Sequence, residues 1–520
     1  MTVTHDFIKE LLAGAVAKEW VSDDRAICES YSKDPFVGVV HRKHRRDLTT
    51  VPEFVVLPAS TEEVASVLRI ATRYDLKVIP IGTGANMAGL CVPGREGYRV
   101  ISLDLKRMDR ILEIDDVNMT ARIQPCVSIA RTQAETMKRG LWNGGTPLGP
   151  ANVGLLSNIM FSGGSTWQSA LKYGLGVRSL VNLTIVLPNG DILKTGSLTL
   201  PQAGNFGWSG PGPEIKGLFD WGHCGTFGVV TEATVKLHPW AGGDWPEERI
   251  YDRPPLPKNH RIFWIKFPSD AEIARAMVEI CHAGIGSHLN GASDAWNANA
   301  TQRTSELAEK VFREGYFPKH LIYVVLAGVT SEKQLDYEEK VLRQIVEECN
   351  GEFMEGEFLG TVSTWNFDAF RTADTVRDCR IGAFAGLWMG FAQIKHRKQY
   401  FEDKQKLVET LPHQILDEET PYVYVMDRGY YSVFETDTYF DQSKNNDVDQ
   451  ERELAKRGFI DLAMKSKLGF LMLAEPLTTI LGAQVGPNFH QLSINMKNVF
   501  DPKDTMNPGK LVSMKPKPAK

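Results

Sequence analysis

A glycine-rich stretch over residues 78–93 is the part of the sequence best suited to bind an anion. It places Gly82, Gly84 and Gly89 within eight positions, directly after an apolar run typical of a β-strand. Glycines leave backbone N–H groups unobstructed, so such a loop can close around phosphate oxygens. The alternative is a dinucleotide-binding G-x-G-x-x-G turn, and Asp104 stands near where that motif has its ribose-binding acid. That motif must open a helix, whereas proline and glycine follow here at Pro93 and disfavour one. The sequence therefore predicts a loop between strands that binds an anion through backbone amides.

Three further segments share this small-residue character. They cover residues 144–165, residues 172–187 and residues 225–239. The second contains a buried strand followed by a Pro188-Asn189-Gly190-Asp191 hairpin turn. Small residues at this density let the backbone approach a large flat ligand, although a glycine-rich loop without a ligand is the alternative for each segment alone. The order and spacing of the segments together favour one extended binding site.

The elements that must position these segments alternate between strands and helices. Strands are predicted over residues 54–57, 77–80, 100–103 and 120–124, and helices over residues 60–74 and 128–138. A proline-rich connector over residues 240–257 separates this α+β region from a second one. There the sequence predicts strands over residues 261–265 and 320–326 and helices over residues 271–283 and 331–348. The first 50 residues are expected to be mostly helical, and residues 515–520 form a basic tail.

Composition narrows the function classes. The 520 residues, 42% hydrophobic and 24% charged, predict a soluble globular protein of two or three domains. The net charge of −5 offers no electrostatic case for a nucleic-acid partner. No apolar run reaches the roughly 20 residues that span a bilayer, and no secretory signal is apparent. Seven cysteines without a C-x-x-C pair indicate reduced thiols, hence a cytoplasmic location and no cysteine-ligated metal site.

Taken together, these segments resemble the flavoproteins related to vanillyl-alcohol oxidase and p-cresol methylhydroxylase, with glycolate oxidase and D-lactate dehydrogenase as more distant relatives. The likeness extends to the motif Phe500-Asp501-Pro502-Lys503-Asp504-Thr505-Met506-Asn507-Pro508-Gly509-Lys510 near the C-terminus. The resemblance implies an α+β fold, with an FAD-binding domain of two subdomains over residues 1–245, completed by residues 490–514. It also implies an α+β cap domain over residues 246–489.

The resemblance also implies which residues hold FAD. They come from the four glycine-rich segments and the C-terminal motif: Pro80, Ile81, Gly82, Thr83, Gly84, Ala85, Asn86, Met87, Thr146, Pro147, Leu156, Ser157, Asn158, Gly163, Gly164, Ser165, Gly225, Gly228, Val229, Val230, Asn507 and Lys510. The tract containing Arg428, Tyr430 and Tyr431 falls where relatives carry an arginine and a residue that can tether the flavin covalently. These three are the candidate catalytic residues, and a pair of aromatic side chains on a cap strand is the alternative for the tyrosines.

The implied activity is hydride transfer from an alcohol or benzylic carbon of an apolar or aromatic molecule to flavin N5. No H-G-D-G-N metal motif of the lactate and glycolate relatives is present, and Phe470-Leu471 stands where relatives have a phenolate-binding Tyr-Arg pair. A D-2-hydroxy-acid dehydrogenase and a non-catalytic flavin-binding subunit are the alternatives. A homo-oligomer is expected, with oxygen, a cytochrome or a quinone as the electron acceptor.

Overall fold

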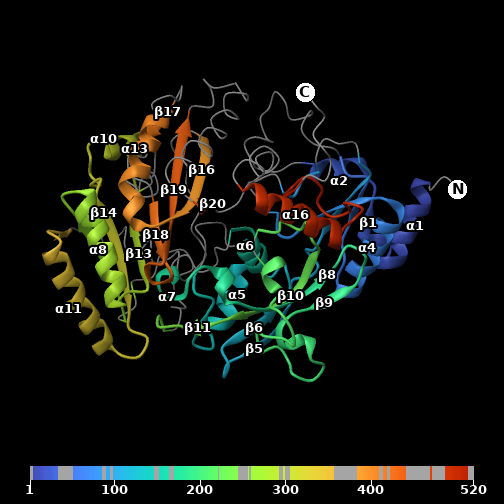
Figure 1. Ribbon diagram of the computed structural model, residues 1–520, viewed down its shortest axis with the longest axis horizontal. Coiled ribbons are helices and arrows are strands. Elements are labelled where there is room, and N and C mark those ends of the chain that lie inside the picture. The colour runs from blue at the N-terminus through green and yellow to red at the C-terminus, as the bar shows by residue number, and fades with distance from the viewer. Residues whose placement is uncertain are drawn as a thin grey trace.

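The computed structural model describes most of the chain and builds it around three main sheets (Figure 1). The described residues are 4–32, 51–84, 90–93, 98–145, 152–162, 169–220, 222–243, 256, 259–291, 297–298, 305–355, 383–408, 414–417, 422–440, 469–470 and 486–512. Two smaller sheets lie on one side of the molecule and a large third sheet lies on the other (Figure 1).

The first small sheet has the order β1-β2-β4-β3, with β2, β4 and β3 parallel. Its strands are β1 (Val21–Ser22), β2 (Phe54–Val56), β3 (Lys77–Ile81) and β4 (Val100–Asp104). The helices α1 (His5–Val16) and α4 (Thr61–Tyr74) share a core with it, and α2 (Arg25–Ser30) follows β1. Ser60 caps α4 by accepting the Glu63 N–H at 3.1 Å, as the capping signature predicts. Asp104 at the end of β4 accepts from the Tyr31 hydroxyl at 2.5 Å, so this carboxylate serves the fold.

The second small sheet is antiparallel and has the order β5-β6-β10-β8-β9. Its strands are β5 (Ile111–Asp115), β6 (Thr120–Ile123), β8 (Leu180–Val186), β9 (Ile192–Lys194) and β10 (Val229–Lys236). The helices α5 (Ile129–Met137) and α6 (Leu155–Ser162) contribute buried apolar residues to its core. A short pair, β7 (Leu141–Trp142) with β11 (His238–Pro239), and the one-turn helix α7 (Ala170–Tyr173) lie toward the third sheet.

The C-terminal segment returns to the two small sheets. After α16 (Pro487–Phe500), residues 501–512 run beside β3, where Val78 donates to the Thr505 carbonyl and Asn507 donates to the Val78 carbonyl. The Lys497 ammonium is buried and donates to the Thr226 carbonyl at 2.9 Å and to the Asp501 carboxylate at 2.6 Å. This ion pair is hydrogen-bonded away from water, so it fixes the segment against the loop that precedes β10.

The third sheet forms the cap. Its order is β15-β12-β14-β13-β18-β19-β16-β20, with β17 also paired to β19. The strands are β12 (His260–Lys266), β13 (His288–Gly291), β14 (Leu321–Ala327), β15 (Glu352–Phe353), β16 (Ala383–Ala392), β17 (Gln414–Asp417), β18 (Tyr422–Met426), β19 (Tyr431–Phe440) and β20 (Gly469–Phe470). One face is covered by α8 (Asp270–Ala283), α11 (Glu332–Glu348) and α13 (Arg397–Val408), and α10 (Ser305–Arg313) precedes β14.

The predicted strands and helices agree with these elements to within one or two residues at each end. The predicted α+β fold class is confirmed, and the second predicted α+β region forms the third sheet. No helix begins in the described residues 82–84 and 90–93 between β3 and β4, as expected for an anion-binding loop. The domain boundary at residue 245 and the basic tail lie outside the described residues and stay predictions.

Candidate functional site

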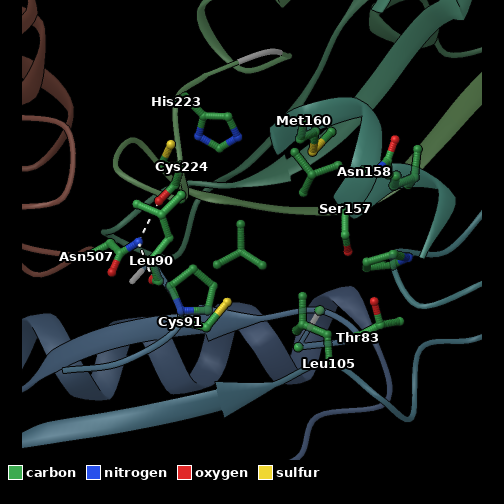
Figure 2. Close-up of a pocket in the computed structure, with 18 of the residues that line it drawn as sticks. Thr83, Leu90, Cys91, Leu105, Ser157, Asn158, Met160, His223, Cys224 and Asn507 are labelled. Carbon is green, nitrogen blue, oxygen red and sulfur yellow. Dashed lines mark hydrogen bonds between the residues drawn. The ribbon is translucent and has the colours of Figure 1, made fainter. Parts of the chain in front are cut away.

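A cavity of about 150 Å³ lies where segments of the two small sheets and the C-terminal segment meet (Figure 2). Its walls come from the loop after β3, the start of α6, the loop before β10 and Asn507. The described residues that line it are Pro80, Gly82, Thr83, Gly84, Leu90, Cys91, Leu105, Pro125, Val153, Leu156, Ser157, Asn158, Met160, His223, Cys224, Gly225, Gly228, Val229, Val230 and Asn507.

The glycines of the lining are required by close packing and by backbone conformation. A Cβ on Gly82 would collide with the Ser157 hydroxyl, and one on Gly225 would lie 2.5 Å from Pro80 Cγ. Gly84 differs, because it has φ +74° and no atom of the described residues lies within 4 Å of where its Cβ would be. Glycine adopts this left-handed conformation without the penalty that other residues meet. The absence of a side chain thus lets Gly82 pack against Ser157 and Gly225 pack against Pro80. At Gly84 it leaves space beside the described lining of the cavity.

Three hydrogen bonds connect the walls across elements far apart in the sequence. The Gly154 N–H donates to Thr83 Oγ1 at 2.9 Å and ties the β3 loop to the start of α6. Asn507 Nδ2 donates to the Cys224 carbonyl at 2.5 Å and lies 3.4 Å from the Leu90 carbonyl (Figure 2). The walls of the cavity are therefore joined by hydrogen bonds between side chains and main-chain groups, and not by the strands of one sheet.

The described lining has no acidic, lysine or arginine side chain. Burial favours the neutral forms of His223 and Cys224, because it lowers the pKa of His223 to about 4 and raises the pKa of the Cys224 thiol to about 12. An anionic ligand must therefore be recognised by backbone amides and hydroxyls, as the sequence predicts for the glycine loop.

Comparison with known proteins identifies the ligand of this region. Residues 52–196 match the family described as FAD binding domain. These residues include β2, β3 and β4 and most of the cavity lining. The chain contains an FAD-binding domain.

Two curated relatives align with this FAD-binding domain and its surroundings. The chain is 33% identical over 190 residues to glycolate oxidase subunit GlcD of Bacillus subtilis, which is 36% of this chain and 38% of that relative. It is 31% identical over 240 residues to D-lactate dehydrogenase (cytochrome) 1, mitochondrial, of Saccharomyces cerevisiae, which is 46% of this chain and 36% of that relative. The matched region thus covers less than half of the length of each of these curated relatives.

Solved structures extend the likeness to the whole fold. A p-cresol methylhydroxylase with substrate bound superposes with a TM-score of 0.77 at 16% identity, covering 99% of this chain and 98% of the other. The 4-ethylphenol oxidase of Gulosibacter chungangensis, in an isoeugenol complex, gives a TM-score of 0.75 at 17% identity, covering 98% of both chains. The resemblance predicted from the sequence is confirmed, as is FAD as the cofactor.

The cavity suits part of FAD. Gly84 presents open backbone to it, the walls are apolar apart from hydroxyls and amides, and His223 Nδ1 is buried without a hydrogen-bond partner among the described residues. Open backbone, apolar walls and a buried polar atom without a described partner are expected in a site that binds a ligand with both phosphate and ring groups.

Many of the FAD-binding residues predicted from the sequence line this cavity. They are Pro80, Gly82, Thr83, Gly84, Leu156, Ser157, Asn158, Gly225, Gly228, Val229, Val230 and Asn507. Ile81 instead packs with Ile79 and Val100, and Lys510 is buried but does not line the cavity. The others lie outside the described residues: Ala85, Asn86, Met87, Thr146, Pro147, Gly163, Gly164 and Ser165. Their contacts with FAD stay predictions.

Sequence reasoning missed several lining residues. They are Leu90, Cys91, Leu105, Pro125, Val153, Met160, His223 and Cys224. His223 and Cys224 directly precede the predicted Gly225, so their position in the sequence was a usable signal. The apolar members carry no such signal, because they resemble any other buried residue.

The three candidate catalytic residues surround the turn between β18 and β19, and none of them lines the cavity. Tyr430 is 81% exposed. Arg428 lines a separate cavity of about 240 Å³ together with Lys172 and Glu338. Tyr431 is half-buried; burial raises the pKa of its hydroxyl, and hydrogen bonds from the Leu175 backbone and Arg178 act in the opposite direction. Their catalytic role stays a prediction.

The cap sheet turns buried aromatic residues toward the FAD-binding domain. Trp264 on β12 and Tyr323 on β14 pack in one cluster with Trp142 of β7. The Tyr323 hydroxyl lies 2.9 Å from His288 Nε2 and accepts from Asn290 Nδ2 at 3.2 Å. Aromatic rings therefore pack between β7 and the third sheet, and the Tyr323 hydroxyl among them is hydrogen-bonded to His288 and Asn290.

Within the described part of the chain, no helix is both long and apolar enough to cross a bilayer. No group of three His, Cys, Asp or Glu side chains in that part is arranged to bind a metal ion.

Proposed function

We propose that this chain is an FAD-dependent oxidoreductase that takes a hydride from an alcohol or benzylic carbon of an apolar or aromatic small molecule. The observation that carries the proposal is the neutral, glycine-lined cavity of an FAD-binding domain joined to a cap sheet. When bound, FAD supplies the hydride-accepting flavin ring. The chain must then hold the cofactor and orient the substrate under the cap.

The chain's own residues divide these tasks. Gly82 and Gly84, with Ser157 and Asn158 of α6, would hold the phosphates, because they combine exposed backbone with neutral hydrogen-bonding groups. The C-terminal segment closes the cavity through Asn507. Exclusion of water by these buried walls strengthens each hydrogen bond to the ligand.

The cap supports an apolar or aromatic substrate. Its sheet buries Trp264 and Tyr323 in one cluster with Trp142 of the FAD-binding domain, and aromatic side chains are typical of sites for flat apolar ligands. The two superposed structures are named for p-cresol and 4-ethylphenol, which agrees with this class of substrate. The segment from Trp365 to Arg380, which the sequence places in the cap, lies outside the described residues.

A D-2-hydroxy acid is the second candidate substrate. The matched relatives are named for glycolate and D-lactate, and their identity to this chain exceeds that of the superposed structures. An anionic substrate would need a cationic partner near the flavin ring. Arg428 and Lys172, which line the cavity between α7 and the cap, are the described residues that could provide one.

A substrate screen under anaerobic conditions tests the proposal. Bleaching of the flavin absorbance by aromatic alcohols or alkylphenols, but not by D-lactate or glycolate, is the expected result. Bleaching by the hydroxy acids alone would replace the first candidate with the second. A bound flavin that neither class reduces would favour a non-catalytic flavin-binding subunit. Re-oxidation with oxygen, a cytochrome or a quinone then identifies the electron acceptor.

A further inference from the structure

His223 is a buried imidazole on the wall of the FAD cavity that the sequence motifs did not single out. It lies in the loop before β10, next to Cys224, and its ring borders the cavity (Figure 2). The residue is only 5% exposed, and its Nδ1 has no hydrogen-bond partner among the described residues. A buried polar atom without a partner is rare in folded proteins and is costly. A ligand that fills the cavity is the natural source of the missing partner.

The position of the cavity indicates which half of FAD it holds. All of its lining residues belong to the FAD-binding region or the C-terminal segment, and none of the described residues between 259 and 440 lines it. If the protein is the oxidoreductase proposed above, the flavin ring must meet its substrate beneath the cap. No described cap residue borders this cavity, so the cavity would hold the adenosine diphosphate half of FAD.

The walls divide this half further. Open backbone at Gly84 suits the phosphates. His223 lines the same cavity as the apolar residues Met160, Val229 and Val230, whose surfaces suit a flat purine. Burial keeps the imidazole neutral by lowering its pKa to about 4. A neutral imidazole offers one donor and one acceptor, which matches a ribose hydroxyl or the adenine edge better than a phosphate that needs only donors.

We propose that His223 hydrogen-bonds the adenosine portion of FAD, and that this contact makes the domain prefer FAD over FMN. The residue is a specificity determinant for the cofactor and takes no part in the hydride transfer.

Ligand titration of the full-length apoprotein tests this role without substrate. His223→Phe keeps a ring of similar shape and removes both nitrogens. It is expected to weaken binding of ADP and of FAD about tenfold, the effect of one lost hydrogen bond, and to leave FMN affinity unchanged. His223→Asn retains a donor and an acceptor and is expected to recover most of the loss.

A matched control is His238→Phe. His238 is a partly buried histidine whose Nε2 has no partner among the described residues, but it stacks on Tyr173 and does not line the cavity. Its ADP affinity should equal that of the wild type. Unchanged ADP binding in His223→Phe, or an equal loss for ADP and FMN, would overturn the proposal. If His223→Phe does not fold, His223→Ala takes its place. The affinities of ADP, FAD and FMN are then compared among the wild type, His223→Asn and His223→Ala. Because ADP carries no flavin, a protein that oxidises nothing can still confirm the contact.

Discussion

Asn507 Nδ2 donates a 2.5 Å hydrogen bond to the Cys224 carbonyl across 283 residues of sequence. The bond joins the C-terminal segment to the loop before β10, and both residues line the FAD cavity. The last described segment of the chain is therefore a wall of the cofactor site, so its loss should affect stability and FAD occupancy together.

Replacing Asn507 tests this relationship. Asn507 has φ +42°, a conformation that aspartate also tolerates, so Asn507→Asp removes the donor with little backbone strain. The partly buried Cys224 carbonyl loses the Asn507 donor, and the free energy of unfolding should fall by about 1–3 kcal/mol, with less FAD retained on purification. Urea denaturation and the flavin-to-protein absorbance ratio measure the two effects. Asn495→Asp, on the exposed side of α16, should change neither, and an unaltered urea midpoint for Asn507→Asp would contradict the structural role.

The glycine loop is tested at Gly84. Gly84→Asp places a carboxylate in open space at the cavity and forces a non-glycine residue to φ +74°. The result should be folded protein with little or no FAD, because the added charge repels phosphate. Gly204→Asp is the matched control, since Gly204 has φ +79° and open space but does not line the cavity. Equal flavin content in both variants would show that backbone strain, rather than the site, decides the outcome.

Acid precipitation determines how the flavin is held. Tyr430 is 81% exposed, and Arg178 interacts with the half-buried Tyr431 hydroxyl. Because Tyr430 is exposed and the Tyr431 hydroxyl already has Arg178 as a partner, we expect a colourless pellet and free flavin in the supernatant. Tyr430→Phe and Tyr431→Phe should then have the same flavin content as the wild type. A yellow pellet that either substitution turns colourless would identify that tyrosine as the covalent attachment.

Substrate selectivity at the 4-position tests the Phe470-Leu471 departure from the phenolate-binding pair. Phe470, in β20, has no polar side-chain atom, so it can neither hydrogen-bond a phenolate nor neutralise its charge. The ratio of kcat/KM between a 4-hydroxybenzylic alcohol and its 4-hydrogen analogue should stay within about 10–200-fold. A ratio on the order of 10⁴ would require a hydrogen-bonding residue for the hydroxyl and would reject the prediction.

Stability should fall in mild acid because of buried histidines. Burial, with help from Lys236 and Lys172, lowers the pKa of His238 from 6.5 to about 4. Between these values the unfolded chain binds a proton that the folded chain does not, so stability is full above about pH 6.5 and decreases as the pH falls toward 4. The decrease reaches up to about 3 kcal/mol for this group. His238→Phe keeps the stack on Tyr173, and a urea midpoint measured from pH 7 to pH 4 should vary less in this variant than in the wild type.

Local signals in the sequence determined much of the fold. The capping residue Ser60 and the Asn189-Gly190 turn predicted element ends that the structure has, because caps and turns depend on neighbouring residues alone. Gly82 and Gly84 likewise pointed to a loop that lines the cavity.

Only the tertiary structure decided the roles within that site. Gly82 is needed because Ser157 packs against it, whereas Gly84 is needed for its left-handed backbone, and sequence spacing cannot separate these reasons. His223 became a candidate only when distant segments buried it and left its Nδ1 without a partner. Desolvation, and contact between residues hundreds of positions apart, arise from packing. The pattern of residue types therefore locates the FAD-binding region, but it does not specify the protonation states or hydrogen-bond partners of the residues that line the cavity.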